Sequence, residues 1–353
     1  MRPGDRIRVA LLLAVALLVS PLRAHAAEVF PGATWERVQD LRAAGWDAAK
    51  LSAADELART LSTDAYLVVD RGRIVHEYGA TTLPTNVHSV RKSVLNLLVG
   101  IAVGRGAIDL RRTMADLGID DVDALTASEK GATVEQLLQA RSGVYHPAAY
   151  ETKAMAALRP ARGSASPGSH WYYNNWDFNA LGTILERATG KPVSDALRDD
   201  LAGVLGFEHF TPAADTGLRY EPGSMHPAYT MRLSARDMAR IGLLVLREGR
   251  WDARQVVPRE WVVASLTSYT ESARRGVGYG YLWWIGERGR HFGQVFPGKV
   301  VSARGHRGQY IVIDFARELV IVHKVNSELT SSRRVSTAEF GRLLALVLQA
   351  KVE

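Results

Sequence analysis

The sequence of 353 residues contains no cysteine. This absence excludes thiol nucleophiles, thiolate metal sites, iron–sulfur clusters, disulfides and a lipid-modified N-terminal cysteine. The ten histidines include no pair four residues apart on an expected helix, so we expect no zinc site. The G-x-S-x-G, H-E-x-x-H, Walker A and EF-hand patterns are missing as well. The sequence therefore implies neither a metal nor an organic cofactor.

Long apolar runs are also missing beyond the N-terminus, where no stretch reaches 18 residues. The first 26 residues have the three parts of a signal peptide, namely a basic start, an apolar run and a small-residue cleavage site: Arg2, Arg6 and Arg8, then Val9 to Val19, then Ala24-His25-Ala26. We therefore expect residues 1–26 to be removed and the mature chain, 27–353, to be periplasmic or secreted without a stable membrane span. The alternative is an uncleaved N-terminal anchor.

Strong charge of one sign is likewise absent. The formal net charge is +7, and removal of the four arginines and one aspartate of the first 26 residues leaves +4. This balance is mild for the length and does not indicate a nucleic-acid partner. The hydrophobic content of 47% and charged content of 23% are typical of globular proteins. The chain is long enough for one large two-lobed domain that folds without disulfides or metals.

Hydrophobic periodicity divides the chain into strands at both ends and helices between them. Residues 65–70 and 73–78 predict a β-hairpin, and the apolar segment from Ser89 to Gly104 predicts a buried helix. The remaining expectations are a helical pattern over 35–61, helices that begin at Thr133, Ser234 and Ser336, a loop at 153–169, a turn at 276–280, and strands at 300–304, 310–314 and 319–324. We expect the two ends to share one sheet, with the middle inserted as a helical lobe.

One short motif places a nucleophile beside a base: Ser89-Val90-Arg91-Lys92. Residues three apart on a helix share a face, so the Ser89 hydroxyl can meet the Lys92 amine. Free N–H groups at a helix N-terminus suit an oxyanion, and burial lowers the pKa of a lysine. The alternative is an ordinary first helical turn that carries a lysine whose stem is buried.

Two further segments could contribute to a site. Trp171 to Gly182 combines aromatic rings with amides after a Pro167-Gly168 turn, which suits a pocket wall, although core aromatics at a helix start would look the same. Gly305 to Gln309 lies between two expected strands, and its alternative is a plain hairpin turn.

Taken together and in this order, the three segments resemble the penicillin-recognising serine hydrolases. These are class C β-lactamases, D-alanyl-D-alanine carboxypeptidases, and their esterase and 6-aminohexanoate-dimer hydrolase relatives. The family pattern is S-x-x-K, then Y-x-N, then K-T-G or H-x-G, here Ser89 to Lys92, Tyr173 to Asn175 and His306 to Gly308. The resemblance covers about residues 60–350, with supporting stretches at 133–143, 234–242 and 279–284, and 171–182 looks closest to the aminohexanoate-dimer hydrolase and esterase branch.

This resemblance implies an α/β (α+β) fold of the β-lactamase/transpeptidase type, with an antiparallel sheet flanked by helices and an inserted all-helical lobe. The sheet lobe would comprise about 27–105 plus 290–353, and the helical lobe about 106–289. A cleft between two such lobes is a common place for a ligand.

The resemblance also implies catalytic roles. Ser89 would be the nucleophile that forms an acyl-enzyme, and Lys92 and Tyr173 would exchange its proton, with the order of transfer left open. Asn175 would orient Lys92 and the substrate amide, and His306 would complete the polar network beside Tyr173.

Further residues would bind the substrate. The backbone N–H groups of Ser89 and Gln309 would form the oxyanion hole, and Gly308 would admit the substrate backbone. Arg307 could attract a substrate carboxylate or point outward. Trp171, Trp176, Trp283 and Trp284 could line an acyl pocket, or each could belong to the core.

The sequence departs from the antibiotic-hydrolysing pattern, because His306 and Arg307 stand where lysine and threonine or serine are usual. We therefore expect a serine hydrolase for small esters, amides or peptide-like molecules. The alternative is a β-lactamase or D-alanyl-D-alanine carboxypeptidase. A catalytically silent binding or sensor module is the second alternative, although such a module would be expected to have lost at least one of the motif residues.

Overall fold

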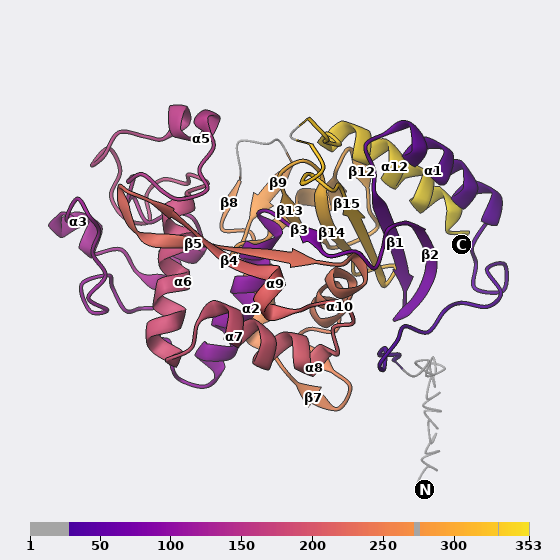
Figure 1. Cartoon of the computed structure of the whole chain (residues 1–353), viewed down its shortest axis with the longest axis horizontal. Coiled ribbons are helices and arrows are strands. Elements are labelled where there is room, and N and C mark those ends of the chain that lie inside the picture. The colour runs from indigo at the N-terminus through magenta and orange to yellow at the C-terminus, as the bar shows by residue number, and fades with distance from the viewer. Residues whose placement is uncertain (1–27, 272–275, 331, 353) are drawn as a thin grey trace, which may run out of the picture.

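A large antiparallel sheet organises the protein, which the computed structural model describes over residues 28–271, 276–330 and 332–352 (Figure 1). The expected signal peptide lies outside the described residues. Among the described residues, eight strands pair in the order β2-β1-β15-β14-β13-β10-β9-β8. Their bounds are β1 Ala65–Asp70, β2 Arg73–Gly79, β8 Thr270–Glu271, β9 Val277–Tyr279, β10 Trp284–Gly286, β13 Val300–Gly305, β14 Gln309–Asp314 and β15 Leu319–Lys324.

The two ends of the chain meet in this sheet, as the sequence predicts. β1 pairs with β2 in the expected hairpin and with β15 on its other side, with Ala65 opposite Lys324. All six residues of β1 are buried, because the strand has neighbours on both edges and helices on both faces. The three strands predicted near the C-terminus are confirmed as β13, β14 and β15.

Helices α1 (Ala48–Thr60) and α12 (Thr337–Ala350) pack side by side over one face of the sheet (Figure 1). α12 begins with the predicted capping box of Ser336 and Glu339. The helical pattern expected over 35–61 was too long, since the helix begins only at Ala48. Asp47 caps it by accepting from Ala49 N, and Gly45 before it has a positive φ of 75°.

The opposite face carries α10 (Ala235–Leu246) and α2 (Val90–Gly104). α2 contacts β13 and β14 on one side and α6 (Asn175–Thr189) on the other, so it lies between the sheet and the second lobe. This explains why α2 is apolar on nearly every face and buried along most of its length. The buried helix expected from Ser89 onward is confirmed, and it ends at Gly104.

The second lobe contains the remaining helices: α3 Ala127–Lys130, α4 Val134–Leu138, α5 Lys153–Leu158, α7 Val193–Ala196 continued by a π-helical turn Leu197–Ala202 and α8 Gly203–Leu205, α9 Pro212–Asp215 and α11 Arg259–Ser265. It is not all helical. β4 (Thr216–Glu221) and β5 (Ser224–Leu233) form a hairpin that also pairs with β3 (Thr85–Asn86). Short strands complete the chain: β6 Arg250–Trp251, β7 Arg254–Gln255, β11 Arg290–His291 and β12 Gln294–Val295.

Three expectations for the middle of the chain need correction. The segment 276–280 forms strand β9 rather than a turn, because Val277 to Tyr279 pair with β10. Strands β8, β9 and β10, whose residues were expected in the helical lobe, extend the main sheet. The expected loop at 153–169 contains α5, which Thr152 caps by accepting from Met155 N.

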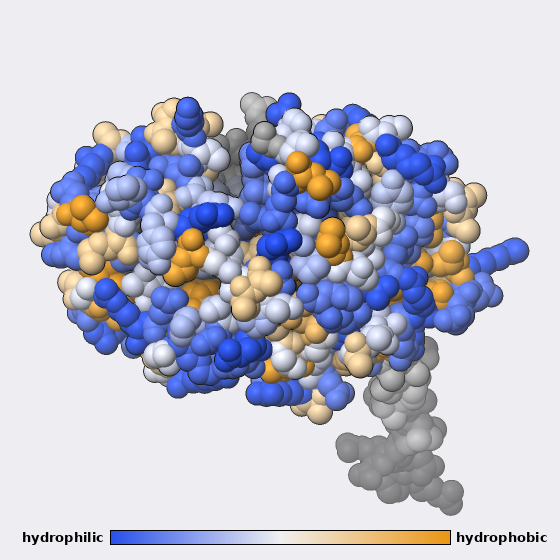
Figure 2. Space-filling view, viewed as in Figure 1, coloured by the Kyte–Doolittle hydropathy of each residue, from blue (hydrophilic) through white to orange (hydrophobic). Residues whose placement is uncertain are grey.

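The face of the molecule in Figure 2 is mostly hydrophilic, with apolar side chains scattered across it. Within the described segments, we find no helix that combines the length and the apolar character that a membrane crossing requires.

Close packing of α10 on the sheet generates a stability prediction. A Cβ at Gly242 would lie 2.4 Å from Val320 Cγ1 and 3.0 Å from Ile311 Cγ2. Gly242→Ala should therefore lower the free energy of unfolding by about 1–3 kcal/mol in urea denaturation. Gly32→Ala is the control, since nothing lies within 4 Å of its added Cβ. Equal stability of the two variants would contradict this packing.

Candidate active site

Ser89 occupies the N-cap position of α2. The residue before it, His88, has a positive φ of 48°, and its N–H donates to Asn86 Oδ1 at 2.8 Å. A non-glycine residue in this region is strained and persists only when its surroundings hold it. The turn therefore fixes the direction in which the Ser89 side chain points. The Ser89 N–H lies before the first hydrogen bond of the helix, so it has no acceptor within the helix.

Lys92 joins two of the three segments singled out in the sequence, 89–92 and 171–182, through its amine. Nζ donates to Ser89 Oγ at 3.1 Å, to Tyr173 OH at 2.8 Å and to Asn175 Oδ1 at 2.7 Å. The same nitrogen lies 4.1 Å from the centroid of the Tyr173 ring and 4.5 Å from that of Phe178. The amine thus bridges the hydroxyls of the expected nucleophile and its expected proton partner.

Burial changes the acid–base behaviour of this lysine, which is only 2% exposed. Desolvation lowers the pKa of Lys92 well below its usual range, and the charge of the neighbouring Arg91 lowers it further. A neutral amine has a lone pair that can accept a proton from a hydroxyl. The arrangement can therefore remove the proton of Ser89 and deliver it to a leaving group.

Asn175 is held in one orientation at the start of α6. Its Nδ2 donates to the Tyr150 carbonyl at 2.8 Å, which leaves Oδ1 to accept from Lys92. Asn174 caps the same helix by accepting from Trp176 N. The local sequence thus starts a helix and aims an amide at the lysine.

An aromatic cluster surrounds the Tyr173 ring. Its centroid lies 5.0 Å from that of Phe178, 6.0 Å from Tyr279 and 5.5 Å from Trp284. Trp171 meets Tyr279 and Trp284 edge-on, at 5.6 and 6.3 Å. Two of the predicted tryptophans, Trp171 and Trp284, therefore belong to the surroundings of Tyr173.

The other two tryptophans belong to the core. Trp176 is fully buried, donates from Nε1 to Asp121 and meets His226 edge-on. Its expected contact with substrate is wrong, because the whole indole is packed inside the lobe. Trp283 is equally buried and donates to Asn96 Oδ1 at 3.2 Å.

The turn between β13 and β14 brings the third segment to the first. A Cβ at Gly305 would lie 2.3 Å from the Val87 carbonyl, so the end of β13 abuts the segment that precedes Ser89. His306 is exposed, and its ring meets that of His88 edge-on at 5.8 Å. Partial desolvation of the ring lowers the pKa of His306, and the charges of Arg307 and Arg334 lower it further.

The remaining residues of this turn are fixed by the segment that follows β15. The Gln309 side chain is buried and donates to the Val325 carbonyl at 2.7 Å. Gly308 has a φ of 105°, and a Cβ there would approach the Val335 carbonyl to 3.0 Å. Arg307 Nη1 lies 3.4 Å from the Thr330 carbonyl and 3.5 Å from that of Ser327. Its guanidinium is thus directed along the chain of residues 327–330.

Sequence reasoning missed several neighbours of the site. His88 shares a hydrogen bond with Ser327 Oγ at 2.7 Å, and its ring stacks on Tyr150 at 6.3 Å. Burial and the charges of His306, Arg307 and Arg91 lower the pKa of His88 to about 4. Tyr150 supplies the carbonyl that holds Asn175, but nothing in the sequence around it signals that role. Tyr279 lay in one of the stretches that supported the resemblance.

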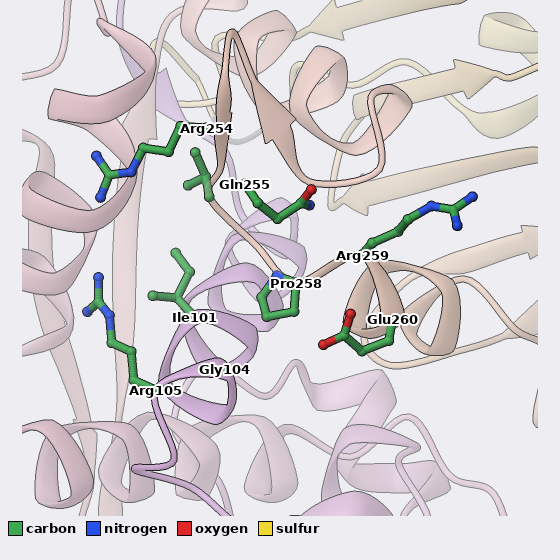
Figure 3. A pocket seen from close by; sticks show the side chains of 9 residues that line it. Ile101, Gly104, Arg105, Arg254, Gln255, Pro258, Arg259 and Glu260 are labelled. Atoms are coloured by element: carbon green, nitrogen blue, oxygen red, sulfur yellow. The ribbon is translucent and has the colours of Figure 1, made fainter.

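A separate cavity of about 430 Å³ opens at the other end of α2, where Ile101, Gly104 and Arg105 face Arg254 and Pro258 (Figure 3). Helix α2 has 15 residues, which places its two ends about 22 Å apart. This cavity is therefore distinct from the Ser89 site. Within the described ranges, no group of three or more His, Asp or Glu side chains is placed to hold a metal ion.

Comparison with known proteins assigns the chain to a family. A model of the beta-lactamase family matches residues 49–346. The chain belongs to the beta-lactamase family. The 6-aminohexanoate-dimer hydrolase of Paenarthrobacter ureafaciens is 25% identical over 316 residues, which cover 78% of this chain and 75% of the relative.

Solved structures share the fold. A class C beta-lactamase superposes with a TM-score of 0.65 at 15% identity, covering 89% of this chain and 99% of that one. The octameric penicillin-binding protein homologue of Pyrococcus abyssi gives a TM-score of 0.63 at 17% identity, covering 86% and 77% of the two chains. The α+β fold implied by the resemblance is thereby confirmed.

The close approach of β13 to the nucleophile segment generates a test. Gly305→Ala would press a methyl group against the Val87 carbonyl and push the 305–309 turn away from Ser89. We expect hydrolysis of a p-nitrophenyl ester to fall by at least about tenfold, because small displacements of reacting groups are costly. Gly298→Ala is the control, since its added Cβ would meet only Ala316 Cβ, at 3.1 Å. An unchanged rate in Gly305→Ala would show that this contact does not position the site.

Proposed function

We propose that this protein is a serine hydrolase that cleaves small amides or carboxylic esters through an acyl-enzyme on Ser89. The observation that carries the proposal is the Lys92 amine held between Ser89 Oγ and Tyr173 OH. The name of the relative, 6-aminohexanoate-dimer hydrolase, supports a small substrate. We propose export as well, on the signal-peptide pattern of the first 26 residues.

Acylation begins with transfer of the Ser89 proton to the Lys92–Tyr173 pair while Oγ forms a bond to the substrate carbonyl carbon. The backbone N–H groups of Ser89 and Gln309 stabilise the resulting oxyanion, and a lost donor of this kind costs roughly 3–4 kcal/mol of activation free energy. The pair then returns the proton to the leaving amine or alcohol as the C–N or C–O bond breaks.

Deacylation reverses these roles. A water molecule gives its proton to the Lys92–Tyr173 pair and attacks the acyl carbon, and Ser89 regains a proton as the free acid departs. Asn175 holds the amine in place throughout, because Tyr150 fixes its amide. Trp171 and Trp284, beside Tyr173, supply an aromatic wall against which an acyl or alkyl chain can pack.

Removal of the nucleophile separates catalysis from folding. Ser89→Ala should abolish hydrolysis of a p-nitrophenyl ester and of a short amide, while the thermal midpoint stays within about 2 °C of the unchanged protein. Turnover and differential scanning fluorimetry on the same preparations give both readouts. Full activity in Ser89→Ala would refute the proposal, and penicillin turnover that exceeds ester and amide turnover would favour the antibiotic-hydrolysing alternative.

The lowered pKa of Lys92 predicts a dependence on pH. Because protonation removes the accepting lone pair, the second-order rate constant for acylation should rise with pH through the ionisation of the coupled Lys92–Tyr173 pair. Lys92→Ala should lower the rate by about 10²–10⁴-fold. Stopped-flow measurement of p-nitrophenol release, with chemistry limiting, tests both. A flat profile between about pH 5 and pH 9 would contradict a role for the pair as base.

A further inference from the structure

Two consecutive cations of α2, Arg91 and Lys92, are buried against α6. Lys92 Nζ donates to Asn175 Oδ1 at 2.7 Å, and Arg91 Nη2 donates to Asn179 Oδ1 at 3.4 Å. Residues four apart on a helix lie on one face, so the two asparagines lie one turn apart on α6. We call the Lys92–Asn175 contact the first rung and the Arg91–Asn179 contact the second rung. The first rung belongs to the site described above, and nothing so far accounts for the second.

Both asparagine amides are fixed by the same loop. Asn175 Nδ2 donates to the Tyr150 carbonyl at 2.8 Å, and Asn179 Nδ2 donates to the Ala149 carbonyl at 3.1 Å. Because each nitrogen donates to one of two consecutive backbone carbonyls, each oxygen is left to accept from a basic side chain. An amide supplies a dipole but no net charge, so neither rung neutralises its cation.

Arg91 is therefore a buried charge without a carboxylate partner among the residues that the structure describes. Its guanidinium carbon lies 4.4 Å from the centroid of the Tyr229 ring and 5.7 Å from that of Tyr150, while Nε and Nη1 have no hydrogen-bond partner within the same described part of the chain. Arg240, which is equally buried, pairs with Glu208 at 2.9 Å. Burial of an unpaired charge is costly, so its retention beside the proposed base calls for a function.

We propose that Arg91 is a positioning residue for Lys92. Held by Asn179, its guanidinium keeps a fixed positive charge beside the lysine, which disfavours the ammonium form and maintains a neutral amine that can accept the Ser89 proton. The inference rests on the proposed function, since it concerns the same base. It also explains why the second rung carries an asparagine, because a carboxylate there would cancel the charge of Arg91.

The other ionisable groups around this pair leave the charge of Arg91 uncompensated. Burial raises the pKa of Tyr229 to about 12, and it raises the pKa of Tyr279 and of Asp177 well above the usual values. Burial also lowers the pKa of His88 to about 4. Tyr229, Tyr279 and His88 are therefore uncharged near neutral pH, and burial favours the protonated, neutral form of Asp177. Further charged and titratable side chains near the pair are Tyr150, Tyr173, His306 and Arg307.

The test compares three variants by the pH dependence of Ser89 acylation with a fluorophosphonate, followed by intact mass. Arg91→Gln removes the charge and Asn179→Asp neutralises it, so both should shift the acidic limb of the rate profile upward by about one pH unit. At pH values on the acidic side of the limb, the acylation rate of these two variants would then be about tenfold lower than that of the unchanged protein. At pH values above the limb, the rates would be equal. Arg91→Lys keeps the charge and should leave the limb within about 0.3 pH unit of the unchanged protein.

A merely structural role predicts a different pattern. If Arg91 had only a structural role, its substitution would lower the acylation rate by the same factor at every pH. The acidic limb of the rate profile would not shift, and this result would overturn the inference. If Arg91→Gln fails to fold by thermal unfolding, Asn179→Asp decides alone, since it retains Arg91, and an unshifted limb there also overturns the inference. Failure of the unchanged protein to label at Ser89 at any pH would instead refute the proposed function, so the two failures are distinguishable.

Discussion

The site depends on burial of a lysine amine among neutral partners. The Lys92 amine is held by two hydroxyls and one amide, with two aromatic rings beside the nitrogen. A carboxylate in place of any of these partners would stabilise the ammonium form. Burial among uncharged partners thus favours the neutral amine that the proposed mechanism requires.

This constraint explains the architecture around α2. A lysine amine that must be shielded from solvent has to be enclosed from several sides. Helix α2 provides this enclosure because it contacts the sheet on one side and α6 on the other. The sheet contributes the 305–309 turn, and the second lobe contributes Tyr173 and Asn175. Strained backbone at His88, Tyr150 and Arg307, each with positive φ, lies where these segments meet. Such strain persists only in a rigid frame.

The sequence predicted those elements that have local signals. The 65–79 hairpin follows from β-branched strands around Arg71-Gly72, α12 from its capping box, and α2 from its apolar faces. The Ser89–Lys92 pair was predicted by residue type and spacing, and Tyr173 by the resemblance to a known family; the structure brings the three side chains together.

What the sequence could not predict depends on contacts between distant segments. Strand β9 looks like a glycine turn until β10 pairs with it, and Trp176 looks like a pocket residue until Asp121 accepts its indole N–H. The Arg91–Asn179 pair joins residues 88 positions apart, and Asn179 is oriented by a carbonyl 30 positions away. No periodicity or motif encodes such a contact.

The central claim is that Ser89 becomes covalently acylated during turnover. The most direct measurement is acid quenching of the protein during hydrolysis of a p-nitrophenyl ester, followed by intact mass and peptide mapping. A good leaving group speeds acylation, so the acyl-enzyme should accumulate. The account predicts a mass increase equal to one acyl group, located on the peptide that contains Ser89. Sustained turnover with no adduct, or with the acyl group on another residue, would contradict it.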